Sequence, residues 1–197
     1  HLDECLRSLQ PLRDKIDSEL IIVDTGSEDD TVEIAKRYTD KVYFHEWTGN
    51  FAEMRNISIS YAKGEWVFII DGDEVLESPS NIIQFFRIKE YRKFNSAAVT
   101  IRNFTRDDGS SFADMLMPRL FRKDYNFGYD GAIHEQPRLK GPLCNLNVTL
   151  FHYGYIATDE NLMKYKFNRN VEILRKDLDK DPDNSYYWFQ LSQSYTA

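Results

Sequence analysis

One stretch of the chain, residues 66–74, constrains the fold more than any other. Residues 66–70 are five consecutive apolar side chains that run directly into Asp71-Gly72-Asp73-Glu74. An apolar run of this length is typical of a buried strand in a parallel sheet. In open α/β sheets, ligands bind beyond the carboxyl ends of such strands, so we expect Asp71 and Asp73 to face a ligand site.

The spacing of the two aspartates indicates what kind of ligand they bind. Along an extended chain, side chains at positions i and i+2 point to the same face, and Gly72 between them lets a ligand approach the backbone. Two hard oxygen donors, with open positions left for water and a diphosphate, suit Mg²⁺ or Mn²⁺. We therefore predict a divalent-cation site at Asp71 and Asp73.

The composition excludes several classes of protein. The chain has 197 residues, 42% of them hydrophobic and 14% aromatic, which favours a folded domain over disorder. Its net charge of −7 argues against nucleic acid as the main partner, since phosphate backbones bind clustered Lys and Arg. Two cysteines, Cys5 and Cys144, imply neither a disulfide framework nor a zinc site. No apolar run approaches the roughly 18 residues of a transmembrane helix. We expect a cytoplasmic protein, with the inner face of the membrane as one location.

The hydrophobic pattern alternates between strands and helices in the first part of the chain. We expect strands at residues 20–23, 42–44, 66–70, 97–104, 115–121 and 147–151. We expect helices at residues 2–12, 30–38, 51–62, 78–94 and 159–180. This order is typical of a parallel sheet with helices on its faces, and it leads us to expect a first strand ahead of residue 1 that this sequence lacks.

The end of the chain carries a different pattern. A break at residues 181–184 separates the last long helix from a further aromatic segment. There Trp188, Leu191 and Tyr195 match the opening of a tetratricopeptide repeat, with Ser192 in place of Gly. A lone repeat cannot bury its own face, and the alternative is an ordinary terminal amphipathic helix. We divide the chain into a domain at residues 1–155 and a helical extension at 156–197.

Three segments taken together resemble a known family. Residues 22–31, 52–56 and 70–74 resemble, in order and spacing, family 2 glycosyltransferases of the GT-A fold, in the branch followed by tetratricopeptide repeats. The resemblance implies a nucleotide-diphospho-sugar transferase fold, Rossmann-like, with a mixed, mostly parallel sheet flanked by helices and a C-terminal helical extension. It also implies that the missing first strand helps to bind the nucleotide base, so the completeness of the donor pocket depends on it.

The resemblance also implies an activity, a hexosyltransferase-type transfer from a nucleotide sugar, usually a UDP-sugar, assisted by Mn²⁺ or Mg²⁺. It implies that Asp24 contacts the base or ribose, that Arg55 lies near the nucleotide, and that Asp71 and Asp73 contact ribose and the metal-bound diphosphate. An inverting outcome follows from the resemblance alone. The acceptor would be a glycan, a lipid-linked molecule or a peptide, and the C-terminal helices would offer a surface to a protein partner.

An inverting transfer needs a base to take the acceptor proton. Our candidate is Glu135, which follows Ile133-His134 in a segment that also resembles this branch. Asp130 and Asp114 are rivals for this role. His134 would orient Glu135 or fill a polar niche, and it is also a candidate phosphate or acceptor contact.

Three further residues are candidates for phosphate, metal or acceptor contacts. His152, at the end of a predicted strand, would be a third metal ligand or a diphosphate contact. Arg119 and Arg122 flank two apolar residues and would bind phosphate or acceptor, unless they are ordinary surface arginines.

Two other functions fit parts of the sequence. Residues 71–75 also match the D-x-D-x-[TV] signature of haloacid-dehalogenase-like phosphatases, in which the first Asp is a nucleophile. Those chains carry the motif on their first strand, whereas here a complete βαβ unit precedes it. The second alternative is a non-catalytic transferase domain that serves as a nucleotide-sugar-binding protein or as a scaffold beside tetratricopeptide repeats.

Overall fold

The computed structural model describes residues 1–106, 108–124, 126–154, 156 and 160–196. Its centre is a five-stranded sheet with the strand order β3-β6-β5-β9-β4. The bounds of these strands are β3 Trp66–Phe68, β4 Glu74–Leu76, β5 Ser96–Phe104, β6 Phe112–Arg122 and β9 Leu143–His152. A two-stranded sheet of β1 (Ile22–Asp24) and β2 (Val42–Phe44) lies beside it, and β7 (Tyr129–Asp130) pairs with β8 (Gln136–Pro137).

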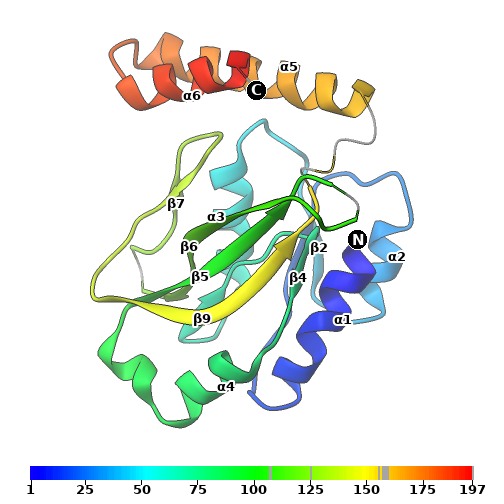
Figure 1. Ribbon diagram of the computed structural model, residues 1–197, viewed down its shortest axis with the longest axis vertical. Helices are drawn as coiled ribbons and strands as arrows, with labels where there is room; N and C mark the ends of the chain where they lie inside the picture. The colour runs from blue at the N-terminus through cyan, green and yellow to red at the C-terminus, as the bar shows by residue number, and fades with distance from the viewer. Residues whose placement is uncertain (107, 125, 155, 157–159, 197) are drawn as a thin grey trace.

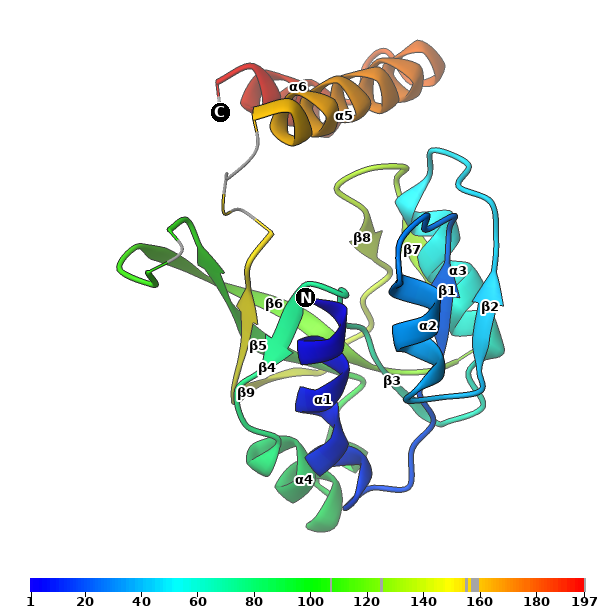
Figure 2. The same ribbon diagram turned by 90° about the vertical axis from the view of Figure 1, so that its right-hand side faces the viewer.

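Helices cover both faces of the main sheet (Figures 1 and 2). Their bounds are α1 Leu2–Arg13, α2 Thr31–Lys36, α3 Phe51–Tyr61 and α4 Ser80–Arg87. Successive residues of β3 face opposite sides of the sheet and pack against different helices. Val67 packs in a cluster with residues of α3, whereas Trp66 and Phe68 pack on the opposite side, against the cluster that includes residues of α1 and α4.

The mixed α/β class agrees with the sequence, but the expectation of a mostly parallel sheet is wrong for the described residues. β1 pairs with β2 and β5 with β9 in parallel, whereas β3–β6, β4–β9, β5–β6 and β7–β8 are antiparallel. The reason is the short connection between β5 and β6, two long strands that together span Ser96 to Arg122. A connection this short joins only antiparallel neighbours, because parallel strands need a crossover of a dozen or more residues.

Several element boundaries also differ from the sequence pattern, and two of these differences have a clear local description. The helix expected over residues 78–94 ends at Arg87, because Lys89 adopts a left-handed conformation with φ of 58°, and a 3₁₀ helix follows at Glu90–Lys93. The strand expected over residues 66–70 ends at Phe68. Its early end places the acidic motif in a turn rather than on an extended strand.

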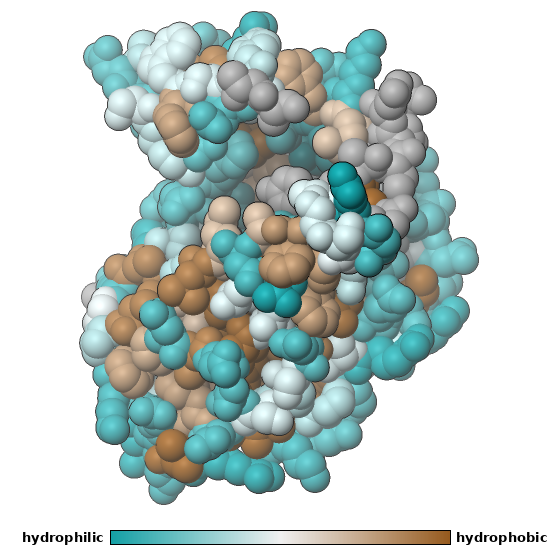
Figure 3. Space-filling view, in the orientation of Figure 1, coloured by the Kyte–Doolittle hydropathy of each residue, from teal (hydrophilic) through white to brown (hydrophobic). Residues whose placement is uncertain are grey.

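The C-terminal segment is a hairpin of two helices, α5 (Glu160–Lys180) and α6 (Ser185–Thr196), that lies beside the loop joining β7 to β8 (Figures 1 and 2). The break predicted at residues 181–184 is found between them. The predicted helix start at Asp159 and the domain boundary at residue 155 lie outside the described residues. On the face drawn in Figure 3, apolar residues gather over the sheet below this hairpin.

Among the described residues, none of the helices combines the length and the apolar character needed to cross a bilayer.

Candidate active site

The acidic motif forms a tight turn between β3 and β4. The backbone N–H of Glu74 donates to the carbonyl of Asp71 at 3.0 Å, and the N–H of Asp71 donates to Oε2 of Glu74 at 2.9 Å. These two hydrogen bonds join the first and last residues of the segment 71–74 and so fix it as a turn. The expectation that Asp71 and Asp73 point the same way is therefore wrong, because it assumed an extended chain.

Asp71 points toward two arginines. Nη1 of Arg55, on α3, lies 2.8 Å from Oδ1 of Asp71, and Nη2 of Arg119, on β6, lies 3.3 Å from Oδ2. Partial burial alone would raise the pKa of Asp71, but the two guanidinium groups outweigh it and hold that pKa well below its usual range. Asp71 is therefore a carboxylate neutralised on both oxygens by fixed cations.

Two further carboxylates complete this arrangement, which we call the inner cluster: Asp71, Arg55, Arg119, Glu74 and Glu135. Glu74 is 1% exposed and pairs with Arg119, and its burial raises its pKa to about 7 although Arg119 opposes the shift. Nε of Arg55 lies 2.5 Å from Oε1 of Glu135. Arg55 thus joins the acidic turn to the candidate base.

Asp73 lies at the opposite side of the turn, in a more open group that we call the outer rim: Asp73, His152, Asn103 and Gly154. The Asp73 side chain is 38% exposed, and its Oδ2 lies 3.4 Å from Nε2 of His152. The other ring nitrogen, Nδ1, hydrogen-bonds to Oδ1 of Asn103 at 2.7 Å. Register explains this meeting, because His152 at the end of β9 pairs with Glu74 on β4 and with Asn103 on β5.

Gly154 packs closely against these two side chains. A Cβ at this position would lie 2.5 Å from both Oδ2 of Asp73 and Nε2 of His152. Burial alone would lower the pKa of His152, but its hydrogen bond to Asp73 and the nearby carboxylates raise the pKa above its usual value. The outer rim thus places a carboxylate and an imidazole together, beside a backbone position where a side chain does not fit.

The two groups differ in how well they suit a divalent cation. Asp73 and His152 offer one carboxylate and one imidazole, which is the small donor set expected where substrate phosphates and water supply the rest. Asp71 does not fit as a ligand, because both of its oxygens already contact arginine. In the part of the chain that the structure describes, no group of three or more His, Cys, Asp or Glu side chains is arranged to hold a metal.

Asp24 ends β1 and uses its side chain locally. It is 8% exposed, and its carboxylate accepts hydrogen bonds from the backbone N–H of Gly26 at 3.1 Å and of Ser27 at 3.3 Å. Gly26 has φ of 114°, a conformation that favours glycine. The contact of Asp24 with a nucleotide stays a prediction.

The remaining candidates are dispersed. Arg122 lies beside Trp66 at the start of β3, where it pairs with Glu65 and donates to the carbonyl of Tyr91 at 3.1 Å. The structure therefore brings Arg119 to the acidic turn but keeps Arg122 with these structural partners. His134 is exposed and has φ of 50°, whereas Glu135 beside it contacts Arg55.

The rival bases have partners of their own. Asp114 forms a two-point ion pair with Arg102 at 2.8 Å, and Asp130 lies 3.3 Å from Arg138. Glu135 differs from both because its partner Arg55 also pairs with Asp71 of the acidic turn.

Comparison with known proteins finds a family match for the first part of the chain. Residues 1–87 match the sequence model described as Glycosyl transferase family 2. We call residues 1–87 the family 2 segment because of this match. It contains α1 through α4, and so the whole acidic turn of residues 71–74.

Two similar proteins carry different names, one a glycosyltransferase and the other a TPR repeat-containing protein. The chain is 28% identical over 180 residues to the SPbeta prophage-derived glycosyltransferase SunS of Bacillus subtilis (strain 168), covering 87% of this chain and 42% of SunS. It is 40% identical over 70 residues to a TPR repeat-containing protein of Synechococcus elongatus, covering 36% of this chain and 17% of that protein. The chain thus spans less than half of the length of these relatives.

A solved structure shows the fold. The chain is similar to the crystal structure of S. aureus TarS 1-349, with a TM-score of 0.53 and 15% identity, covering 98% of this chain and 66% of TarS. The family 2 segment therefore lies in a GT-A fold, as the sequence predicted.

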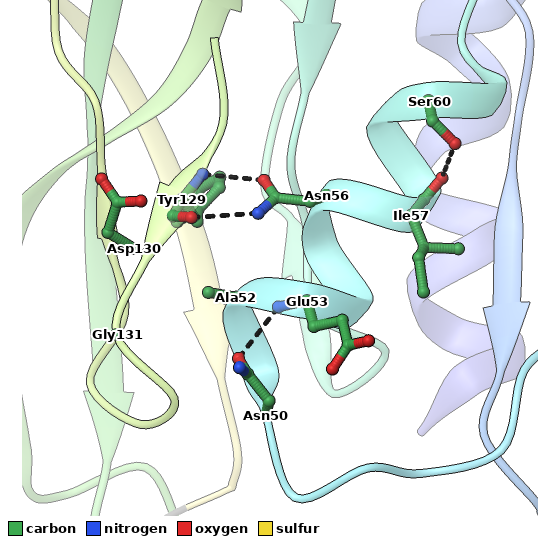
Figure 4. Close-up of a pocket in the computed structure, with 9 residues that line it drawn as sticks. All are labelled: Asn50, Ala52, Glu53, Asn56, Ile57, Ser60, Tyr129, Asp130 and Gly131. Carbon is green, nitrogen blue, oxygen red and sulfur yellow. Dashed lines mark hydrogen bonds between the residues drawn. The ribbon is translucent and has the colours of Figure 1, made fainter. Parts of the chain in front are cut away.

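A cavity of about 470 Å³ opens between α3 and the β7 segment (Figure 4). The Asn56 side chain exchanges two hydrogen bonds with the backbone of Tyr129, at 3.0 and 2.8 Å, and this pair forms one wall. The guanidinium of Arg55 lies 5.5 Å from the centroid of the Tyr129 ring, so Tyr129 contacts the inner cluster as well as the cavity. The lining residues are Asn50, Ala52, Glu53, Asn56, Ile57, Ser60, Tyr129, Asp130 and Gly131.

Sequence reasoning missed three residues of the candidate site. Glu74 was quoted as part of the motif but given no role, although an acidic residue directly before an apolar strand segment is an unusual occupant of a buried position. Asn103 and Gly154 meet His152 only through strand register and a close backbone approach. No local pattern marks either one.

Proposed function

We propose that this protein transfers a sugar from a nucleotide-diphospho-sugar, with a UDP-sugar as the first choice, to an acceptor nucleophile, with Mn²⁺ or Mg²⁺ at the outer rim. One observation carries the proposal. Within a family 2 segment, the acidic turn separates a neutralised, fixed Asp71 from an accessible Asp73 that faces His152 beside Gly154.

The reaction breaks the bond between the sugar C1 and the diphosphate oxygen and forms a bond between C1 and the acceptor oxygen. Negative charge then grows on the departing diphosphate. A cation held by Asp73 and His152 would supply Lewis-acid stabilisation of that charge. Fixed electrostatic groups of this kind are often worth about 10² to 10³ in rate each.

Glu135 would take the acceptor proton as the new bond forms, a contribution typically worth about 10² to 10⁴ in rate. Its ion pair with Arg55 orients the carboxylate, which is 12% exposed, toward the acidic turn. The second oxygen remains to accept the proton. This assignment gives an inverting transfer, because a single displacement by the acceptor inverts the configuration at C1.

The phosphatase alternative fits the geometry less well. It needs the first Asp of the motif as a nucleophile, with a carboxylate oxygen open to the substrate. Both oxygens of Asp71 contact guanidinium groups instead. An assay with a generic aryl phosphate tests this alternative directly, and clear turnover would support it.

The decisive experiment is calorimetric titration of the protein with UDP, with and without Mn²⁺, followed by a screen of several nucleotide sugars. We expect binding that strengthens with Mn²⁺, and release of UDP from one of the donors. Asp73→Asn should remove the metal dependence, whereas Asp114→Asn, a matched change at an exposed ion pair, should retain it. Binding that ignores the metal, or no binding, would favour a scaffold without catalysis.

A further inference from the structure

The loop that carries Glu135 lies against the C-terminal hairpin. Ile133 is 4% exposed and belongs to one buried cluster with side chains of α5 and α6. The helical members of this cluster are Val171, Ile173, Leu174, Leu178 and Leu191. Figure 2 shows the two helices above the β7–β8 segment, on the side where that loop turns. The candidate base is thus two residues from an anchor held by another part of the chain.

The backbone of the same loop is hydrogen-bonded on two sides. Asp177 of α5, 9% exposed, accepts from the N–H of Ala132 at 3.4 Å. The carbonyl of Ala132 accepts from the N–H of Phe51 at 2.8 Å, at the first residue of α3. Since Arg55 lies one turn further along α3, the loop, the helix and the ion pair of Glu135 form one connected unit.

A third contact fixes the residue directly before Glu135. The hydroxyl of Tyr186, on α6, donates to the carbonyl of His134 at 2.9 Å and accepts from Nε2 of Gln136 at 2.9 Å. His134 has φ of 50°, a left-handed conformation that is uncommon for residues other than glycine. Such a conformation persists where the surroundings hold it, and here the surroundings include α6.

We propose that the α5–α6 hairpin positions Glu135, with Asp177 and Tyr186 as positioning residues. This proposal rests on the proposed function, in which Glu135 is the base. It makes the hairpin part of the catalytic unit rather than an appendage. It also means that anything binding to the hairpin can change the transfer rate without contacting the donor.

Two matched variants test the proposal, Tyr186→Phe and Tyr195→Phe. Both remove one hydroxyl from α6, but Tyr195 accepts from Arg175 at 2.8 Å on the hairpin itself. We expect Tyr186→Phe to lower kcat about threefold to tenfold, the worth of one hydrogen bond, and to leave the donor KM unchanged. Tyr195→Phe should behave as wild type. Equal effects of the two variants would overturn the proposal.

A second pair of variants separates positioning from folding. Asp177→Asn keeps an oxygen that can accept from Ala132, whereas Asp177→Ala removes it. We expect the alanine variant to lose kcat and the asparagine variant to recover most of it, with similar UDP affinity in both. Equal kcat losses in the two variants would contradict the proposed role of this hydrogen bond.

Hydrogen–deuterium exchange gives a readout that does not depend on activity. In Tyr186→Phe we expect faster exchange of the amides of residues 131–136, with unchanged exchange in α3 beyond its first turn. If wild-type protein transfers no sugar, the proposed function fails, and the exchange data alone decide whether the hairpin holds the loop. Unchanged exchange in a folded Tyr186→Phe protein would refute the inference.

Discussion

The inner cluster and the outer rim are two ends of one four-residue turn, yet they are built differently. In the inner cluster, each oxygen of Asp71 contacts an arginine, and the neighbouring Glu74 is almost fully buried. At the outer rim, Asp73 is 38% exposed and faces His152 across a position that has no side chain. The two aspartates of one motif therefore differ in their partners, and we expect them to differ in their tasks.

This difference shows how a short acidic motif can be both rigid and reactive. An unpaired buried carboxylate is costly, so Asp71 and Glu74 require Arg55 and Arg119 beside them. Once these pairs fix the turn, Asp73 has a fixed position without needing a strong partner of its own. Pre-organisation of this kind is what electrostatic stabilisation of a leaving group requires.

The largest effect is expected from Glu135→Gln, which keeps the size and a hydrogen-bond acceptor for Arg55 but removes the base. If Glu135 takes the acceptor proton, transfer should fall by about 10² to 10⁴ while UDP binding is retained. The measurement is the steady-state rate with a donor identified by the screen. The matched controls are Asp130→Asn and Asp114→Asn, which neutralise the rival bases and should cost little. A near-normal rate in Glu135→Gln would exclude Glu135 as the base and leave it only a structural role as the partner of Arg55.

The next effect concerns Asp73→Asn, which tests the outer rim. We expect transfer to fall by about 10² to 10³, because the amide is a poor ligand for a divalent cation beside the diphosphate. Stability should stay within about 0.5 kcal/mol of wild type, since the side chain is partly exposed and its partner His152 retains Asn103. Rates, together with denaturant unfolding, measure both quantities. A large loss of stability would mean that the rim is structural, as the inner cluster is.

Asp71→Asn should lower the stability of the protein, whereas Asp73→Asn should leave it nearly unchanged. Breaking a fully buried ion pair costs about 3–5 kcal/mol, but the Asp71 side chain is 35% exposed and solvent screens it. We therefore expect Asp71→Asn to lower the free energy of unfolding by about 1–2 kcal/mol. Denaturant titration of Asp71→Asn and Asp73→Asn side by side provides the comparison. Equal stabilities would remove the distinction between the two regions.

The difference in stability between wild type and Asp71→Asn should change with pH in a definite direction. The pKa of Asp71 is lower in the folded protein than in the unfolded chain, where it is about 3.9. The ionised form is therefore favoured by folding, so its stabilisation is complete above the unfolded pKa and is lost as the pH falls through the folded pKa. The gap in stability between wild type and Asp71→Asn should be constant near neutral pH and should shrink below about pH 4. A gap that widens in acid would contradict the assignment.

Sequence reasoning located the acidic turn because its signal is local. Five apolar residues before Asp71, together with the Asp24 segment and the Arg55 helix, suffice to predict a strand and a family 2 resemblance, although the strand ends at Phe68, earlier than expected. The GT-A fold followed from the same residues and is confirmed by the likeness to TarS. The sequence did not predict the order and direction of the later strands. Strand partners are set by long-range packing and by the length of the β5–β6 connection.

The finer arrangement of the site depends on contacts that no spacing rule describes. Arg119 and Arg122 are three residues apart on β6, and their local pattern offers no reason to separate them. In the structure, one reaches Asp71 and Glu74 while the other lies beside Trp66, because successive strand residues face opposite sides and β6 pairs with β3 in a fixed register. The hold of α5 and α6 on the Glu135 loop is likewise a product of tertiary packing.

The smallest effect is expected from Gly154→Ala, which tests whether the space at the outer rim matters. The new Cβ would lie 2.5 Å from Oδ2 of Asp73 and from Nε2 of His152, so both side-chain ends must move aside. Because these ends are flexible, the fold should tolerate the change, but a displaced Asp73 should lower Mn²⁺-dependent UDP affinity about fivefold. Gly141→Ala, at a position with open space around its Cβ, is the control. Unchanged affinity in Gly154→Ala would mean that ligand approaches Asp73 from another side, and the outer rim would then need a different donor set.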